Sequence, residues 1–414
     1  MGSRFRRFFV LSTSISVVFF FTLLAGCGSS NNSGSSGSGS GGTGSSNPGS
    51  GGSGSGSGSS NSVAYAYTSN GTSILAYAVN TDGSLSTVSG SPYAIGTHIE
   101  QLSAQGALVT NGANLYAIVA GNIPTSLIIA PINKSNGSLS QATTSSAITG
   151  DPNTSDYADL LALDSTGSSL YAVVGLSDQD AGVNVFGVGS GTSANHVQYL
   201  GGGAIAGSAL VFTSDNHYAY NWNCSARVTG VNGYTRASDG TLTSLPALQA
   251  QPPVTSPGVG YCPAGLAASA NGYLAIAWIP FGYASTVQVG NQIAVGIYKI
   301  NADGTISLVP NSGVTTAISA TAALGFDPSG SYLAVAGTGG VQIYMLNSAG
   351  TLTPVGTAQD ASVNFASVAW DKSNHVFATS SSQLYVFSSN SGALTPASGS
   401  PYGGGAALTV LPLQ

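Results

Sequence analysis

The sequence contains very little charge. Of its 414 residues, 8 are Lys or Arg and 14 are Asp or Glu, which is 5% of the chain, whereas ordinary soluble domains carry about 25%. The formal net charge is −6, and no stretch rich in Lys or Arg exists beyond the first seven residues. Because nucleic-acid phosphates require a basic surface, we expect no nucleic-acid partner.

The chain is also poor in the patterns that build long helices. It holds 58 Gly, and Ser, Thr and Val are frequent, which disfavours helices and favours strands. Hydrophobic residues nevertheless make up 42% of the chain, with 19 Tyr among them, so a large core can be buried. The composition therefore predicts an all-β protein.

The N-terminus has the form of an export signal. Arg4, Arg6 and Arg7 precede an apolar run over residues 8–24, which is shorter than the ~20 residues that a membrane-spanning helix needs. The run ends in Leu24-Ala25-Gly26-Cys27, which resembles the bacterial lipobox. That resemblance implies cleavage after residue 26 and diacylation of Cys27, which then becomes the lipid anchor. The alternative is an uncleaved transmembrane helix.

A low-complexity tract separates this signal from the rest of the chain. Residues 28–62 are almost all Gly or Ser, so they cannot offset chain entropy by burial and are expected to form a disordered tether. Gly28, rather than Asp, follows the anchor, which in Gram-negative lipoproteins implies the outer membrane. We therefore expect a signal peptide over 1–26, a lipidated linker over 27–62, and a folded domain over 63–414. The domain would be held outside the cytoplasm, at the outer membrane or cell surface.

A short turn motif repeats along the folded domain. Asp82-Gly83-Ser84-Leu85 recurs at residues 136–139, 239–242, 303–306 and 349–352, and in altered form at 391–394. Each copy reads as a turn that needs positive φ, supplied by Gly, leading into a short apolar strand.

A second repeated element precedes each turn. It consists of an apolar run, a polar turn and an aromatic-led strand, as in residues 160–164 followed by 170–174. The same order returns at residues 209–220, 266–276, 324–335 and 368–378. These are segments of period 2 and high β-propensity, so they predict pairs of neighbouring strands.

Together the two elements predict a β-propeller. A repeat of about 50 residues is typical of four-stranded propeller blades, and the folded domain has room for seven of them. The first unit begins at its second strand, residues 63–68, while residues 407–411 are left over as a strand at the other end. We predict that this C-terminal strand closes the first antiparallel blade, which leaves no open edge. Two β-sandwiches or a β-solenoid are the alternatives.

The spacing of two motifs resembles a known family. Gly83-Ser84-Leu85 is followed by Gly90-Ser91-Pro92-Tyr93, and Gly392-Ala393-Leu394 is followed at the same distance by Gly399-Ser400-Pro401-Tyr402. This is similar to the seven-bladed lactonase family, often called YVTN-like, which includes 6-phosphogluconolactonase and cycloisomerases. The resemblance implies a propeller and a lactonase-like hydrolase. Residues 67–70, Tyr-Thr-Ser-Asn, depart from the YVTN tetrad, and the shared motifs belong to the scaffold.

The connections of a propeller sort polar residues onto two faces. The upper face, formed by the connections that lead into the inner strands and those that link the second and third strands, receives His98, Glu100 and Arg227. It also receives five acidic residues: Asp156, Asp159, Asp178, Asp180 and Asp360. The remaining His residues, with Lys134, Arg236, Lys299 and Lys372, map to the lower face, where we expect structural or exposed roles.

His98, Glu100 and Arg227 are the candidate catalytic residues. His98 and Glu100 are two residues apart, so in an extended segment their side chains share one side. A carboxylate that orients an imidazole makes the imidazole a general base, and Arg227 could stabilise an oxyanion. The alternative for His98 and Glu100 is a solvated loop pair.

The candidate substrate follows from the count of cations. A phosphorylated lactone calls for two or more cations, and the upper face offers one Arg, so an uncharged sugar lactone is the better match. The alternative function is a non-catalytic surface propeller that binds a protein or glycan. We expect a monomer in either case.

Two cysteines remain in the folded domain. Cys224 and Cys262 map to the upper face of the fourth and fifth blades, and in an exported protein a disulfide is favoured over free thiols. No further Cys or His lies close enough in sequence for a zinc site. Asp178-Gln179-Asp180 lacks a third oxygen donor for Ca²⁺ and favours a solvated turn. We therefore expect no metal and no cofactor.

Overall fold

The computed structural model describes most of the folded domain. The described residues are 62–99, 105–119, 125–148, 158–174, 182–201, 209–224, 229–248, 250–255, 257, 259–282 and 292–413. All of them belong to one compact unit, Gly54–Gln414. Their regular structure consists of strands alone, and no helix among them could cross a membrane.

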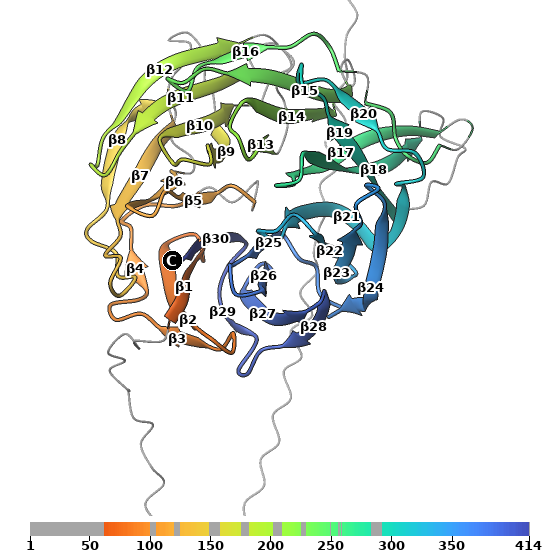
Figure 1. Cartoon of the computed structure of the whole chain (residues 1–414). Coiled ribbons are helices and arrows are strands. Elements are labelled where there is room, and N and C mark those ends of the chain that lie inside the picture. The colour runs from red at the N-terminus through yellow and green to blue at the C-terminus, as the bar shows by residue number, and fades with distance from the viewer. Residues whose placement is uncertain are drawn as a thin grey trace, which may run out of the picture. The chain divides into compact units, whose positions relative to one another are not determined.

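Within these residues the strands form six antiparallel sheets (Figure 1). The first sheet unites the two ends of the folded domain in the order β3-β2-β1-β30, with β4 beside β2. Its strands are β1 (Ser62–Ser69), β2 (Ser73–Asn80), β3 (Leu85–Thr87), β4 (Tyr93–Ala94) and β30 (Ala407–Pro412). β30 runs antiparallel to β1, with Ala64 opposite Pro412 and Ser69 opposite Ala407.

Three sheets of four strands follow, each built from consecutive strands. They comprise β5 (Leu108–Thr110), β6 (Asn114–Ile118), β7 (Thr125–Pro131) and β8 (Thr143–Ile148); β9 (Ala158–Leu163), β10 (Ser169–Val174), β11 (Gly182–Val188) and β12 (Ala194–Gly201); and β13 (Leu210–Phe212), β14 (Tyr218–Cys224), β15 (Thr229–Arg236) and β16 (Leu242–Ser244).

The next sheet is twice as large because one strand belongs to two four-strand runs. Its strands are β17 (Val259–Ala268), β18 (Tyr273–Gly282), β19 (Gln292–Ile300), β20 (Ile306–Leu308), β21 (Val314–Phe326), β22 (Tyr332–Thr338), β23 (Gly340–Leu346) and β24 (Leu352–Gln359). The start of β21 pairs with β19, where Val314 lies opposite Val295, and its end pairs with β22, where Phe326 lies opposite Leu333. The chain thus passes from one run to the next without leaving the sheet.

The last sheet completes the set of inner strands. It contains β25 (Ser367–Trp370), β26 (His375–Thr379), β27 (Gln383–Asn390), β28 (Ala393–Pro396) and β29 (Tyr402–Gly403). The innermost strands contact one another in the order β5, β9, β13, β17, β21, β25 and β30, and β30 in turn contacts β5 (Figure 1).

Alternating side chains explain why the strands are apolar on both sides. On β10, Leu170 and Ala172 pack toward the sheet of β5–β8, whereas Tyr171 and Val173 pack toward the sheet of β13–β16. Successive residues of a strand point to opposite faces, so a sheet covered on both faces requires nearly continuous apolar strands. The aromatic-led strands of the sequence meet this requirement.

The repeated turn motif lies at the contacts between sheets. The hydroxyl of Tyr67 donates to the carbonyl oxygen of Gly137 at 3.0 Å, Tyr171 donates to Gly240 at 2.8 Å, and Tyr220 donates to Gly304 at 2.9 Å. In each case the Tyr belongs to one sheet and the Gly to the turn of the next. The motif therefore joins sheets as well as reversing the chain, a role that the sequence reading did not include.

Candidate functional site

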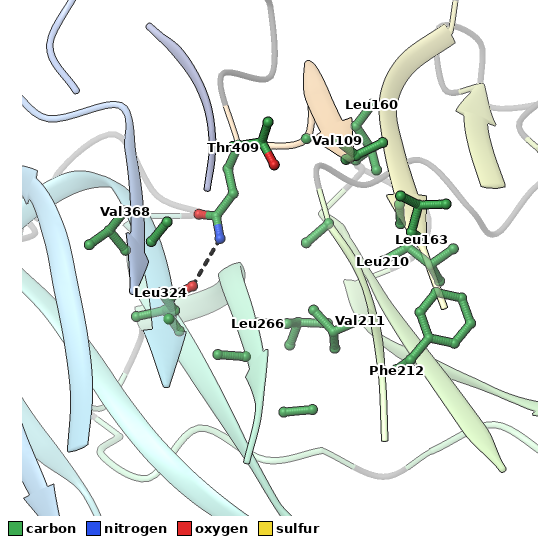
Figure 2. Close-up of a pocket in the computed structure, with 18 of the residues that line it drawn as sticks. Val109, Leu160, Leu163, Leu210, Val211, Phe212, Leu266, Leu324, Val368 and Thr409 are labelled. Carbon is green, nitrogen blue, oxygen red and sulfur yellow. Dashed lines mark hydrogen bonds between the residues drawn. The ribbon is translucent and has the colours of Figure 1, made fainter. Parts of the chain in front are cut away.

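The inner strands surround a cavity of about 460 Å³ (Figure 2). Each of the seven inner strands contributes to its wall, and the contributed side chains are mostly aliphatic, among them Leu160, Leu210, Leu266, Leu324 and Val368. The same positions of successive repeats therefore meet at one place. The first apolar run of each repeat forms an innermost strand, so these runs together line a candidate binding site.

Among the described residues that line it, the cavity carries few polar side chains and no ionisable one. The polar side chains among the lining residues are Gln105, Ser165 and Thr409. Gln105 lies before β5, yet its Nε2 donates to the carbonyl oxygen of Leu324 on β21 at 2.9 Å (Figure 2). β5 and β21 are not neighbours in the ring of inner strands, so this hydrogen bond crosses the cavity. Sequence reasoning missed Gln105, because nothing in its local pattern indicates a contact with a residue so far along the chain.

Such a cavity suits a neutral, compact ligand. Aliphatic walls favour apolar surface, and a carboxamide can exchange hydrogen bonds with a hydroxyl or carbonyl group. General acid-base chemistry requires a titratable group, which the described lining residues do not supply. Any such group must therefore come from the connections beside the cavity.

Of the three candidate catalytic residues, His98 is described. It is solvent-exposed in the connection between β4 and β5, directly before the buried Ile99. The backbone N–H of Ile99 donates to the carbonyl oxygen of Gly71 at 2.7 Å, which ties this connection to the turn between β1 and β2. Glu100 and Arg227 lie outside the described residues, so the cluster of the three stays a prediction.

The other acidic candidates of the upper face contribute little to a described site. Asp360 is exposed and adopts a positive φ of 49° in a turn. Asp156, Asp178 and Asp180 lie outside the described residues, and so does the side chain of Asp159, whose backbone belongs to β9. In the part of the chain that the structure describes, no three His, Cys, Asp or Glu side chains gather as a metal site would require.

The remaining histidines make local contacts consistent with structural roles. His196 Nε2 lies 3.1 Å from Asn184 Oδ1, and the exposed His217 lies 3.3 Å from the carboxylate of Asp215. His375 is buried, and its Nδ1 lies 2.7 Å from Asp371 Oδ2 within the same turn.

Arg236 has a buried partner that the sequence did not reveal. From the end of β15 its guanidinium forms an ion pair with Asp164, which follows β9 in the neighbouring sheet, and both side chains are almost fully buried. Its Nε donates to the hydroxyl of Tyr171 at 3.0 Å. Burial raises the pKa of Tyr171, and the nearby Arg236 opposes that rise. The arginine therefore stabilises a contact between sheets.

Cys262 is disulfide-bonded and buried on β17. Cys224 ends β14, a strand that contacts β17, and its side chain lies outside the described part. Three neighbouring side chains on β14, Asn221, Trp222 and Asn223, each bury a polar atom for which the described chain offers no hydrogen-bond partner. These three atoms lie close in sequence to Cys224, at the C-terminal end of β14, and can exchange hydrogen bonds there.

The comparisons with known proteins find structural neighbours. No model of a known protein family matches the chain, and no curated protein matches it. Three similar solved structures are a candidate 6-phosphogluconolactonase from Bacteroides uniformis, another from Bacteroides fragilis, and a periplasmic gluconolactonase from Pseudomonas aeruginosa.

The structural alignments with this chain cover almost the whole length of each of these three proteins. The Bacteroides uniformis protein is 14% identical with a TM-score of 0.63, and the alignment covers 85% of this chain and 100% of that one. The Bacteroides fragilis protein is 15% identical with a TM-score of 0.58, and the alignment covers 84% of this chain and 98% of that one. The Pseudomonas aeruginosa protein is 16% identical with a TM-score of 0.59, and the alignment covers 85% of this chain and 100% of that one. The chain therefore shares the all-β propeller fold of these 6-phosphogluconolactonase-like proteins.

Proposed function

We propose that this protein is an extracytoplasmic, lactonase-like propeller that hydrolyses an uncharged sugar lactone. The observation that carries the proposal is the likeness, over 85% of the chain, to the whole of a periplasmic gluconolactonase. The name of that protein supplies both the reaction class and the compartment. The export signal expected over residues 1–26 supports the same compartment.

The proposed architecture is a ring of seven four-stranded blades closed by β30. The cyclic contacts of the seven inner strands and the pairing of β30 with β1 support it. In this arrangement the eight-stranded sheet corresponds to two blades that share β21. A closed ring leaves no inner edge exposed, which fits a domain displayed outside the cell.

In the proposed reaction, His98 acts as general base and Glu100 orients it. His98 takes a proton from water, the water oxygen attacks the lactone carbonyl, and Arg227 stabilises the oxyanion that forms. The ring C–O bond then breaks, and the leaving oxygen receives the proton from His98. The absence of cations among the described lining residues of the cavity supports an uncharged substrate.

The direct test is an assay of the purified domain on gluconolactone and on its 6-phosphorylated form. We expect turnover of the uncharged lactone and none of the phosphorylated one. His98→Ala should lower the rate by about 10²–10⁴-fold, the usual contribution of a general base. His217→Ala, which removes an exposed histidine from another turn, is the matched control and should keep the rate. Efficient turnover of the phosphorylated lactone would overturn the argument from charge.

The alternative function is a non-catalytic propeller that binds a protein or glycan. It is favoured by one observation, the lack of any ionisable side chain among the described residues that line the cavity. Absence of turnover on both lactones, together with saturable binding of a neutral oligosaccharide, would support this alternative over hydrolysis.

The proposed anchor is a diacylated Cys27, with residues 27–62 as the tether and residues 63–414 as a monomeric propeller. Mass spectrometry of the mature N-terminus tests it. Cys27→Ser should release the protein from the membrane fraction, and membrane retention through an uncleaved helix would contradict the proposal.

We also propose Cys224 as the disulfide partner of Cys262. The disulfide-bonded state of Cys262 and the contact between β14 and β17 support this pairing. Peptide mapping of exported protein without reduction should recover the two cysteines in one linked peptide. Free Cys224 in that sample would rule the bridge out.

A further inference from the structure

Two segments of the chain are structural duplicates. Gly90-Ser91-Pro92-Tyr93 leads into β4 and Gly399-Ser400-Pro401-Tyr402 leads into β29. Tyr93 lies opposite Ile74 on β2, just as Tyr402 lies opposite Leu384 on β27. The hydroxyl of Tyr93 donates to the carbonyl oxygen four residues earlier, and so does that of Tyr402. Equivalent positions around the two segments can therefore be compared directly.

Beside β29 the space toward the next sheet is filled by Tyr77. This side chain extends from β2, is 7% exposed, and has its ring centroid 6.0 Å from that of Tyr402. Its hydroxyl donates to the carbonyl oxygen of Gly403 at 2.9 Å. A phenol ring thus occupies this junction, with its hydroxyl bonded to the backbone of β29.

Beside β4 the corresponding position holds Ala130 on β7. The registers establish the equivalence: two residues after Tyr77, Val79 lies opposite Leu85, and two residues after Ala130, Ile132 bridges to Leu139. Leu85 and Leu139 are the same Leu of the repeated turn motif. The phenol that fills one junction is therefore missing from the other.

A cavity of about 420 Å³ lies at this second junction. Its buried floor includes Ile74 and Ala130, which are 0% and 1% exposed. Pro92, Ala94 and Gly96 on its rim are exposed, so a ligand can enter from solvent. No charged residue is among the described residues that line it, which favours a neutral ligand. An apolar cavity of ~150 Å³ already accepts a benzene ring, so the size suffices for a single ring.

The junction between β4 and β7 also retains a backbone carbonyl that can accept a hydrogen bond from a phenol hydroxyl. Ala94 occupies the place of Gly403, whose carbonyl accepts the hydroxyl of Tyr77. A Cβ atom at Gly403 would lie 3.6 Å from that hydroxyl, which is ordinary van der Waals contact. The methyl group of Ala94 therefore leaves room for a hydroxyl group in the same position.

We propose that the cavity between β4 and β7 binds a small neutral phenol. Its ring would lie over Ile74 and Ala130 beside Tyr93, and its hydroxyl would donate to the carbonyl oxygen of Ala94. The ligand reproduces what Tyr77 does in the duplicate junction. This site is separate from the cavity that the inner strands surround, and it does not depend on the proposed hydrolysis.

The probe for the test is 4-methylphenol, which is the tyrosine side chain as a free molecule. Calorimetric titration of the wild-type domain should give one saturable site. Toluene, which lacks the hydroxyl, should bind about 2–13-fold more weakly, the equivalent of a hydrogen bond worth 0.5–1.5 kcal/mol. NMR should show contacts between the probe and the methyl groups of Ile74 and Ala130.

Two reciprocal variants make the test decisive. Ala130→Tyr should fill the cavity from within, abolish binding and leave the domain folded, because the duplicate junction already holds a Tyr. Tyr77→Ala should open the junction beside β29 as well and raise the stoichiometry from one to two. Unchanged binding by Ala130→Tyr, or no saturable binding by the wild type, would overturn the proposal. If Tyr77→Ala fails to fold, Ala130→Tyr and the NMR contacts decide the question.

Discussion

At the scale of single residues, the ion pair of Arg236 with Asp164 is buried between two sheets, in a chain that carries little charge. Arg236 and Asp164 come from neighbouring sheets, and their side chains are 7% and 0% exposed. A further hydrogen bond from Arg236 Nη2 to Ser169 Oγ, at 3.1 Å, helps to satisfy the buried guanidinium. A buried charge is tolerated when it is paired and hydrogen-bonded, and Arg236 meets both conditions here.

We predict that Arg236→Met destabilises the domain by about 3–5 kcal/mol, because it leaves the carboxylate of Asp164 buried without a compensating positive charge. The double variant Asp164→Asn with Arg236→Met should recover part of that loss, since it removes both charges. Urea unfolding of the two single variants and the double variant measures the coupling. Additive losses would show that the two side chains do not stabilise each other.

At the scale of elements, the Gly of the turn motif has two separate reasons to be Gly. Gly304 has a φ of +80°, and a Cβ atom there would lie 2.5 Å from the ring of Tyr218 and 2.7 Å from Leu245. The hydroxyl of Tyr218 donates to the carbonyl oxygen of Ala302 at 2.6 Å, which holds the ring in place. Backbone conformation and close packing against the preceding sheet both exclude a side chain at this position.

Gly272 allows the two reasons to be separated. Its φ is +78°, and nothing lies within 4 Å of an added Cβ atom. We predict that Gly272→Ala costs about 1–2 kcal/mol from backbone strain alone. Gly304→Ala should cost about 1–3 kcal/mol more, because the methyl group displaces Tyr218. Thermal unfolding of both variants checks this, and equal losses would mean that the contact between sheets contributes nothing.

At the scale of the whole domain, β30 connects the end of the folded domain to its first strand, β1. It pairs with β1 along six residues and buries Ala407 and Leu408. It also contacts β5 and β25, the inner strands on either side of it. Its loss would affect three sheets at once.

We predict that a chain ending at Gly405 melts far below the full-length protein. Truncation exposes the inner edge of β1, and the loss of a buried Leu such as Leu408 alone costs about 2–5 kcal/mol. Calorimetry of the truncated and full-length proteins measures the difference. Deletion of residues 1–61 is the control and should leave the melting temperature unchanged, and equal melting of all three would contradict closure by β30.

Much of the fold could be read from local patterns. The turn with positive φ in Gly240 and the aromatic-led strand at Tyr171 depend on neighbours along the chain, because φ preference and two-residue alternation are local properties. The strand predicted over residues 407–411 appears as β30. The sequence by itself therefore determined an all-β chain of repeated strand pairs, and it located most of the turns.

Other features depend on which repeats become neighbours in space. Gln105 meets Leu324, Arg236 meets Asp164, and Ala130 replaces an aromatic side chain at one junction, and no local pattern indicates any of these. β21 belongs to two strand runs because its pairing partners change midway along it. Such contacts join residues far apart in the chain, so only the tertiary structure decided them, because it sets which sheets lie side by side.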